Sequence, residues 1–148
     1  MNRRKRGFRA ERELVQKLWS RGFAVIRGPA SGSGARKIFY PDVVAIYKGN
    51  VYVFEVKYRS NKDHIIYLDK EKVRKLKDFA ARANAQTLLA VRFKGGKWYI
   101  IPLDSQSLED VGTRYKVNIQ KLKAIELEEF IRNVVNNRLD KYINNSAG

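Results

Sequence analysis

The sequence predicts a single α/β domain in which helices cover a central mixed β-sheet. Three observations support this fold class. Helical and strand-like hydrophobic patterns follow one another along 148 residues, and one domain is expected at this length. Two apolar runs near the middle are separated by only a Gly-Asn pair, which is typical of a β-hairpin. Both strands of this hairpin are largely apolar on both faces, so the sheet needs cover on both sides.

The N-terminal part predicts an arm, a helix, a strand and a loop. Residues 1–6 are strongly basic and are expected to form a flexible arm. Apolar residues recur at helical spacing over 10–21, and Gly22 is placed to end that helix. A short strand follows at 23–26. The stretch 28–41 holds a Ser-Gly-Ser-Gly run and two prolines, which predicts a long mobile loop.

The hairpin and the element after it come next. The two strands are expected at 42–48 and 51–57, joined by a two-residue loop at 49–50. A helix over 69–83 begins with an aspartate that can cap it and carries one apolar stripe. This helix is a candidate to cover one face of the sheet.

The remaining chain predicts strands and a final helix. Strands are expected at 87–93 and 97–103, joined around a Gly-Gly pair. The stretch 104–124 is irregular, with a candidate short strand near Tyr115. An amphipathic helix is expected from 126 to about 143. The order of these elements completes the predicted α/β sandwich.

The net charge of +16 indicates a polyanionic partner, because neutralising phosphates releases counterions and drives binding. Charge kept for solubility and a membrane-surface patch are the alternatives. The basic cluster over 1–6 could be an arm that grips phosphates, a localisation signal or a solvated terminus, and we favour the arm. The residues expected to contact nucleic acid are Arg3, Arg4, Lys5, Arg6, Arg9, Arg12, Arg36 and Lys37.

The composition also excludes several classes of protein and site. There is no Cys and only one His, His64, so disulfides, thiolate nucleophiles, iron–sulfur clusters and Cys- or His-rich zinc sites are excluded. A bound metal would need oxygen ligands, which favours Mg²⁺ or Mn²⁺. No apolar run is long enough for a bilayer span or a secretory signal, so we expect a cytoplasmic protein that binds no membrane.

The hairpin brings together charges that could do chemistry. With the two-residue loop given above, Lys48 pairs with Val51, and Asp42 lies opposite Lys57. Glu55 shares their face, because alternate residues of a strand point the same way. Two carboxylates can hold Mg²⁺ with several waters, and a lysine can orient or help deprotonate one of them. These groups would suffice to hydrolyse a phosphodiester; the alternative is a surface salt bridge on a half-exposed strand.

These residues also carry a resemblance. Pro41-Asp42, followed after twelve residues by Glu55-Val56-Lys57, resembles the PD-(D/E)xK nuclease motif. With three further segments the chain resembles the archaeal Holliday junction resolvase family, Hjc, over most of residues 5–103 and weakly beyond. The further segments are Gly-Phe-Arg-Ala-Glu-Arg at 7–12, the strand at 22–27 and Pro-Ala-Ser-Gly-Ser at 29–33.

The resemblance implies a restriction-endonuclease-like sandwich and a metal-dependent endonuclease that nicks two opposed strands of four-way junction DNA. It implies that Glu11, Asp42 and Glu55 bind the divalent metal, Mg²⁺ or Mn²⁺. It further implies that Lys57 assists the attacking water and that Ser31 acts at the junction. Glu11 fits independently, because it shares an inward helical face with nearby apolar residues.

Two symmetric nicks require two active sites, so we expect a two-fold homodimer that works on DNA in the nucleoid. Candidate interfaces are the apolar residues around 98–103 and the final helix. Two alternatives stay open. One is a nuclease of the same fold that acts on other branched or duplex DNA, and the other is a non-catalytic basic protein that binds nucleic acid.

Overall fold

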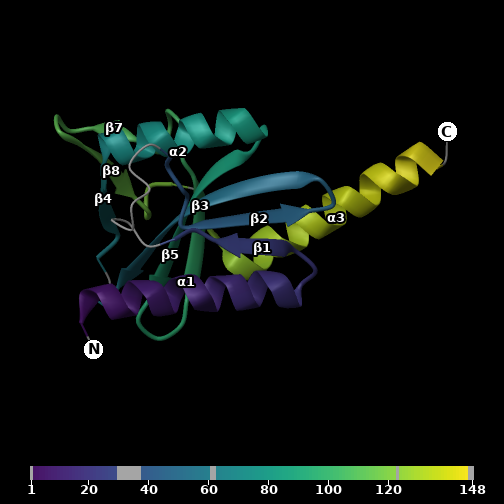
Figure 1. The fold of residues 1–148 in the computed structure, drawn as a ribbon, viewed down its shortest axis with the longest axis horizontal. Coiled ribbons are helices and arrows are strands. Elements are labelled where there is room, and N and C mark those ends of the chain that lie inside the picture. Colours follow the sequence, from purple (N-terminus) through teal and green to yellow (C-terminus); the bar gives the residue numbers. More distant parts are fainter. Residues whose placement is uncertain (1, 30–37, 61–62, 123, 147–148) are drawn as a thin grey trace.

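Figure 1 shows the computed structural model, which describes residues 2–29, 38–60, 63–122 and 124–146. Its helices are α1 (Arg3–Ser20), α2 (Lys70–Ala83) and α3 (Leu127–Ser146). Its strands are β1 (Ala24–Arg27), β2 (Val43–Tyr47), β3 (Asn50–Arg59), β4 (Ile65–Asp69), β5 (Gln86–Phe93), β6 (Trp98–Pro102), β7 (Glu109–Asp110), β8 (Arg114–Asn118) and β9 (Ile125–Glu126). Within the described residues, no helix combines the length and apolarity needed to cross a membrane.

The central sheet is mixed, as the sequence predicts. Among the described residues its strand order is β1-β2-β3-β5-β6-β9, and a smaller antiparallel sheet has the order β4-β8-β7. The pairing of β3 with β5 is parallel, whereas the other pairs of the central sheet are antiparallel. The parallel pair is joined through β4 and α2, which form the crossover connection that parallel strands need.

Helices cover both faces of this sheet, with α1 and α2 on opposite sides of it in Figure 1. Side chains of α1 and α3 pack with one face, around Phe54. Side chains of α2 and the smaller sheet pack with the other face, around Val53. Successive side chains of β3 therefore point alternately into the two cores. Because Glu55 follows this alternation, its carboxylate belongs to the face that α2 covers.

The first helix begins earlier than the hydrophobic pattern indicates. Helix α1 starts at Arg3, so residues 3–6 of the expected flexible arm make its first turn instead. The side chain of Asn2 accepts a hydrogen bond from the backbone N–H of Lys5 at 2.9 Å, which is a helix N-cap. Arginine and lysine are good helix formers, so this cap lets the helix extend through the basic cluster. The predicted stop is confirmed, since Gly22 follows the helix with φ of 94°.

The hairpin turn lies one residue earlier than predicted. Tyr47 pairs with Asn50, so the loop is Lys48-Gly49 and every cross-strand pairing moves by two residues. Both loop residues have positive φ, 49° and 88°, which is the type I′ turn that matches strand twist. A shift of two residues keeps each side chain on its face, so the hydrophobic pattern cannot distinguish the two registers.

The predictions for the later elements are largely confirmed. Helix α2 starts after Asp69, whose side chain accepts the N–H of Lys72 at 2.9 Å. Strand β4 was not predicted; it pairs with β8, which confirms the candidate strand near Tyr115. The apolar residues Trp98, Ile100, Ile101 and Leu103 are buried inside the chain, so the expectation of an exposed interface at 98–103 is wrong. Residues 30–37, most of the expected mobile loop, lie outside the described residues.

Candidate active site

Asp42 is held at the start of β2 by two backbone contacts. Its Oδ2 accepts the N–H of Val56 at 2.9 Å, and its carbonyl accepts the N–H of Gly28 at 2.9 Å. A Cβ at Gly28 would stand 2.0 Å from the carbonyl oxygen of Pro41, so only glycine permits this approach. The corrected hairpin register places Asp42 beside Glu55 on the neighbouring strand, rather than beside Lys57.

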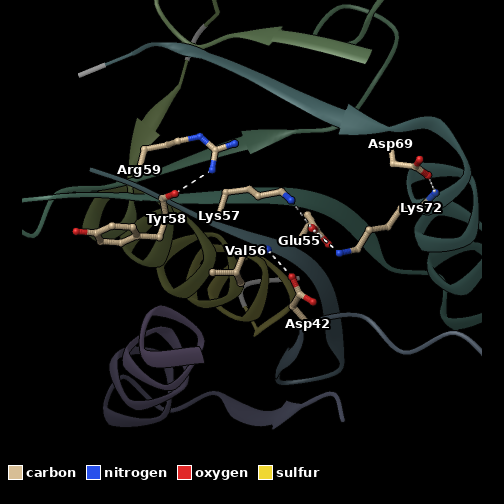
Figure 2. Close-up of polar contacts among 8 residues, drawn as sticks. All are labelled: Asp42, Glu55, Val56, Lys57, Tyr58, Arg59, Asp69 and Lys72. Atoms are coloured by element: carbon tan, nitrogen blue, oxygen red, sulfur yellow. Dashed lines mark hydrogen bonds and ion pairs between the residues drawn. The ribbon is translucent and has the colours of Figure 1, made fainter. Parts of the chain in front are cut away.

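Glu55 lies at the centre of the cluster, as Figure 2 shows. It is only 3% exposed, and one of its oxygens, Oε1, contacts two ammonium groups. The Nζ of Lys72 lies 2.9 Å away and the Nζ of Lys57 lies 3.4 Å away. The other oxygen, Oε2, is buried and accepts no hydrogen bond from the described residues. A buried carboxylate oxygen without a partner is costly and is therefore a place to look for a ligand.

Lys72 is a site residue that sequence reasoning missed. It comes from the first turn of α2, and in the sequence it is one of many lysines of that helix. The one local signal is its place three residues after the N-cap Asp69, which says nothing about Glu55. Only the packing of α2 over β3 brings the ammonium to the carboxylate.

The carboxylates of the site perturb one another. Burial and then the charge of Glu55 raise the pKa of Asp42 to about 7, against the opposing effects of Lys72 and the Val56 N–H. Burial raises the pKa of Glu11, where Arg27 opposes the shift and Glu55 adds to it. Burial lowers the pKa of Lys72, but the charges of Glu55 and Asp42 outweigh it, so this pKa stands above its ordinary value. The site is therefore built around clustered negative charge.

Glu11 takes part in this cluster at longer range. It is half-buried on α1 and interacts through its charge with Glu55 and Lys72. Among the residues that the structure describes, no three Asp, Glu or His side chains stand close enough to hold one metal ion. Asp42 and Glu55 are thus the two carboxylates that the fold brings together on adjacent strands, and Ser31 lies outside the described residues.

The residues present fit a hard divalent cation. Such ions take oxygen ligands, and Mg²⁺ commonly uses one or two carboxylates with several waters. Asp42 and Glu55 provide two carboxylates on one face, and the unpartnered Oε2 of Glu55 is a free lone-pair donor. A cation here would also relieve the repulsion that raises the pKa of Asp42.

A surface rich in arginine and lysine adjoins the carboxylates. Helix α1 and the end of β3 border a groove of about 570 Å³, which Arg3, Lys57 and Arg59 line. A second groove of about 350 Å³ lies between α1 and the β5–β6 turn. We call these two together the basic groove, and its lining cations are Arg3, Arg6, Arg9, Lys57, Arg59, Arg92 and Lys94. Lys57 lines this groove and also contacts Glu55, so the groove adjoins the carboxylate cluster at Lys57.

Five of the cations expected from the sequence to contact nucleic acid line these grooves. Arg3, Arg6 and Arg9 line the basic groove, while Lys5 and Arg12 line an adjoining groove of about 690 Å³.

The other predicted cations lie elsewhere. Arg4 instead lies over the ring of Phe8, with its Cζ 5.5 Å from the ring centroid. Arg36 and Lys37 lie outside the described residues.

Three cations of the groove were not predicted, because they come from separate strand ends. Arg59 ends β3, Arg92 lies near the end of β5, and Lys94 is in the turn that follows. Burial and the charge of Arg3, which lines the same groove, lower the pKa of Arg59. Arg92 pairs with Glu13 of α1, and its Cζ lies 5.7 Å from the ring centroid of Tyr58. Such a concentration of cations is typical of a phosphate-binding surface.

Comparison with known proteins gives consistent results. A model of the family described as archaeal Holliday junction resolvase (Hjc) matches residues 2–139. The chain is 34% identical over 142 residues to the crossover junction endodeoxyribonuclease Hjc of Sulfurisphaera tokodaii, covering 93% of this chain and 96% of that one. It is 34% identical over 113 residues to the Hjc of Archaeoglobus fulgidus, covering 76% and 79%. The solved structure of that Hjc, a Holliday junction resolvase, superposes with a TM-score of 0.70 at 29% identity, covering 85% of this chain and 95% of that one.

Proposed function

Because this chain belongs to the archaeal Holliday junction resolvase family, we propose that it is a crossover junction endodeoxyribonuclease that resolves four-way DNA junctions. Its mixed sheet between helices is the restriction-endonuclease-like fold of that family. One structural observation carries the proposal beyond family membership. Asp42, Glu55 and Lys57 share one face of the hairpin, and Lys57 also opens onto the basic groove.

The residues divide the reaction between them. Asp42 and Glu55 would hold the divalent metal, for which we propose Mg²⁺ with Mn²⁺ as a substitute. Glu11 stays a prediction as a third ligand, and its charge interacts with both carboxylates. When bound, this cation neutralises charge at the phosphate and makes water more acidic. The ammonium of Lys57, 3.4 Å from Glu55 Oε1, orients the attacking water. Ser31 stays a prediction as a residue that acts at the junction.

The basic groove binds the DNA backbone. Its cations come from α1, β3, β5 and the β5–β6 turn, so they present charge over a surface and do not form an element that would enter a DNA groove to contact bases. We therefore propose recognition of junction shape with slight sequence preference. The other DNA contacts, Arg4, Lys5, Arg12, Arg36 and Lys37, stay as predicted.

Two symmetric nicks require two copies of this site, so we propose a two-fold homodimer. Its interface excludes the buried residues of β6, and the final helix stays a candidate. An enzyme that resolves chromosomal junctions works on DNA, so we place it in the nucleoid of the cytoplasm.

The test compares the wild type with Glu55→Gln on a four-way junction and on linear duplex, with and without Mg²⁺. We expect paired nicks at the junction in the wild type with Mg²⁺ only. Glu55→Gln should lower the cleavage rate by at least a hundredfold while junction binding stays within a few-fold, because the groove is intact. Glu109→Gln, at an exposed glutamate of β7, is the matched control and should cleave like the wild type.

Two results would count against the proposal in different ways. Equal cutting of linear duplex would favour a nuclease of the same fold with another substrate. Tight junction binding with no metal-dependent cutting in the wild type would favour the non-catalytic binding protein.

A further inference from the structure

Lys72 makes the shorter of the two lysine contacts with Glu55. Its Nζ lies 2.9 Å from Oε1, against 3.4 Å for Lys57, and the two side chains approach the carboxylate from different elements. Figure 2 shows Lys57 reaching it along β3 and Lys72 from α2. Lys57 has a role at the attacking water, whereas nothing in the proposed reaction uses Lys72.

The charge of Lys72 acts on the whole carboxylate cluster. Glu55, Asp42 and Glu11 all interact with its ammonium, and each of the three also repels another member. Carboxylates packed this closely need a positive charge among them when they are ionised. In the protein without a metal, Lys72 provides that charge at the most buried of the three.

Lys72 is anchored at its backbone, and its side chain is partly exposed to solvent. The backbone of Lys72 is fixed in the first turn of α2 by the Asp69 cap, and α2 is held by buried Val73 and Leu76. Its side chain nevertheless remains 44% exposed. A change of side-chain rotamer can therefore carry the ammonium away from Glu55 toward solvent without any change in the helix.

We propose that Lys72 is the internal counter-ion of the active site: its ammonium takes the place of the divalent cation at Glu55 in the metal-free enzyme and is displaced when the metal binds. This inference rests on the proposed metal site of Asp42 and Glu55. A divalent ion held by the same carboxylate would stand within a few ångströms of the ammonium, and like charges at that separation repel strongly. Metal binding must therefore overcome the Lys72–Glu55 contact.

The inference predicts that the metal binds more tightly when Lys72 loses its charge. Lys72→Met keeps most of the aliphatic stem and removes the ammonium. We expect its dissociation constant for Mn²⁺, measured by electron paramagnetic resonance of the free ion without DNA, to be at least tenfold lower than that of the wild type. Lys72→Arg, which keeps the charge, should stay within about threefold of the wild type.

Lys75→Met is the matched control, because Lys75 is an exposed lysine one turn further along the same helix. Loss of a distant, screened charge should change the dissociation constant by less than about threefold. As a second readout, Mg²⁺ should raise the unfolding temperature of Lys72→Met by more than that of the wild type, because the metal there restores the missing counter-charge. Lys72→Gln, which can still donate to Glu55, serves if Lys72→Met does not fold without metal.

An unchanged or weaker affinity for Mn²⁺ in Lys72→Met, or in Lys72→Gln where that variant replaces it, would overturn the inference. Asp42→Asn and Glu55→Gln separate this failure from that of the metal site. If both carboxylate variants lose Mn²⁺ binding and Lys72→Met binds like the wild type, only the counter-ion role fails. If neither variant loses Mn²⁺ binding, the proposed metal site itself fails.

Discussion

At the residue scale, the pKa of Asp42 differs most clearly from that of an ordinary surface aspartate. Its carboxylate accepts the Val56 N–H, which favours the ionised form, yet burial and the charge of Glu55 outweigh this and raise its pKa to about 7. Below that pH the Asp42 side chain is mostly protonated and neutral, whereas the proposed metal site needs it as a carboxylate. Ionisation of Asp42 therefore opposes folding in the absence of a metal.

This raised pKa predicts a pH-dependent stability. An ordinary Asp of the unfolded chain has a pKa of 3.8, whereas the pKa of folded Asp42 is raised to about 7. Protonated Asp42 therefore contributes its full stabilisation to the free energy of unfolding below pH 3.8, and this stabilisation is lost as the pH rises to 7. Asp42→Asn keeps an acceptor for Val56 and cannot ionise. Without metal, we expect it to exceed the wild type in free energy of unfolding by about 1–3 kcal/mol at pH 8, with little difference at pH 4.

Urea unfolding followed by circular dichroism at both pH values, in the presence of a chelator, measures this. Asp78→Asn, an exposed carboxylate on α2 paired with Arg82, is the control and should show no such gain at pH 8. A gain for Asp42→Asn that is equal at pH 4 and pH 8 would rule out ionisation as its cause.

At the element scale, the β2–β3 hairpin sets the position of the site. Its type I′ turn places Asp42 beside Glu55 and lets the Val56 N–H reach the Asp42 carboxylate. Lys48 occupies this turn with φ of 49°, a conformation that costs a residue with a Cβ about 1–2 kcal/mol. Lys48 is therefore strained in this turn, whereas Gly49 adopts its positive φ without strain.

Opposite stability changes are expected from the two turn residues. Lys48→Asn should raise the free energy of unfolding by about 0.5–1 kcal/mol, because Asn tolerates this conformation and Asn-Gly is a preferred type I′ pair. Gly49→Ala should lower it by about 1 kcal/mol, because φ of 88° strains alanine. Chemical denaturation of both variants measures the changes. With the alternative Gly-Asn loop, Lys48 would be extended, and Lys48→Asn would bring no gain.

At the scale of the whole molecule, α1 borders both the basic groove and the carboxylate cluster. Its basic residues line grooves along the end of β3 and the β5–β6 turn, and Glu11 of the same helix interacts with Glu55. The charge of +16 is therefore not spread evenly. Cations line the approach, and a few carboxylates are kept together where the cleavage would occur.

Removing cations of the basic groove should change the salt dependence of junction binding. Each phosphate contact contributes about 0.9 to the slope of log K against log salt on duplex DNA. We expect Arg59→Gln with Lys94→Gln to make this slope shallower by about 2, measured by fluorescence anisotropy on a catalytically inactive background. Lys75→Gln with Lys77→Gln, on the exposed face of α2, is the charge-matched control. Equal loss of slope in both pairs would mean that the whole surface, not the groove, binds DNA.

The sequence by itself determined the local parts of this protein. The face shared by Asp42, Glu55 and Lys57 follows from the two-residue period of strands, and the start of α2 follows from the Asp69 cap. The mixed sheet follows from the order of the elements, and the demand for a polyanionic partner follows from the net charge. Each of these depends on neighbours in the chain or on composition alone.

Only the tertiary structure decided which distant residues meet. The predicted and the observed hairpin registers put every side chain on the same face of the sheet. The observed Lys48-Gly49 turn is what places Asp42 beside Glu55 rather than Lys57. Lys72 reaches Glu55 because α2 packs over β3, and Arg59 and Lys94 join α1 because two strands end beside it. These meetings depend on packing between segments far apart in the chain, and no local periodicity encodes that packing.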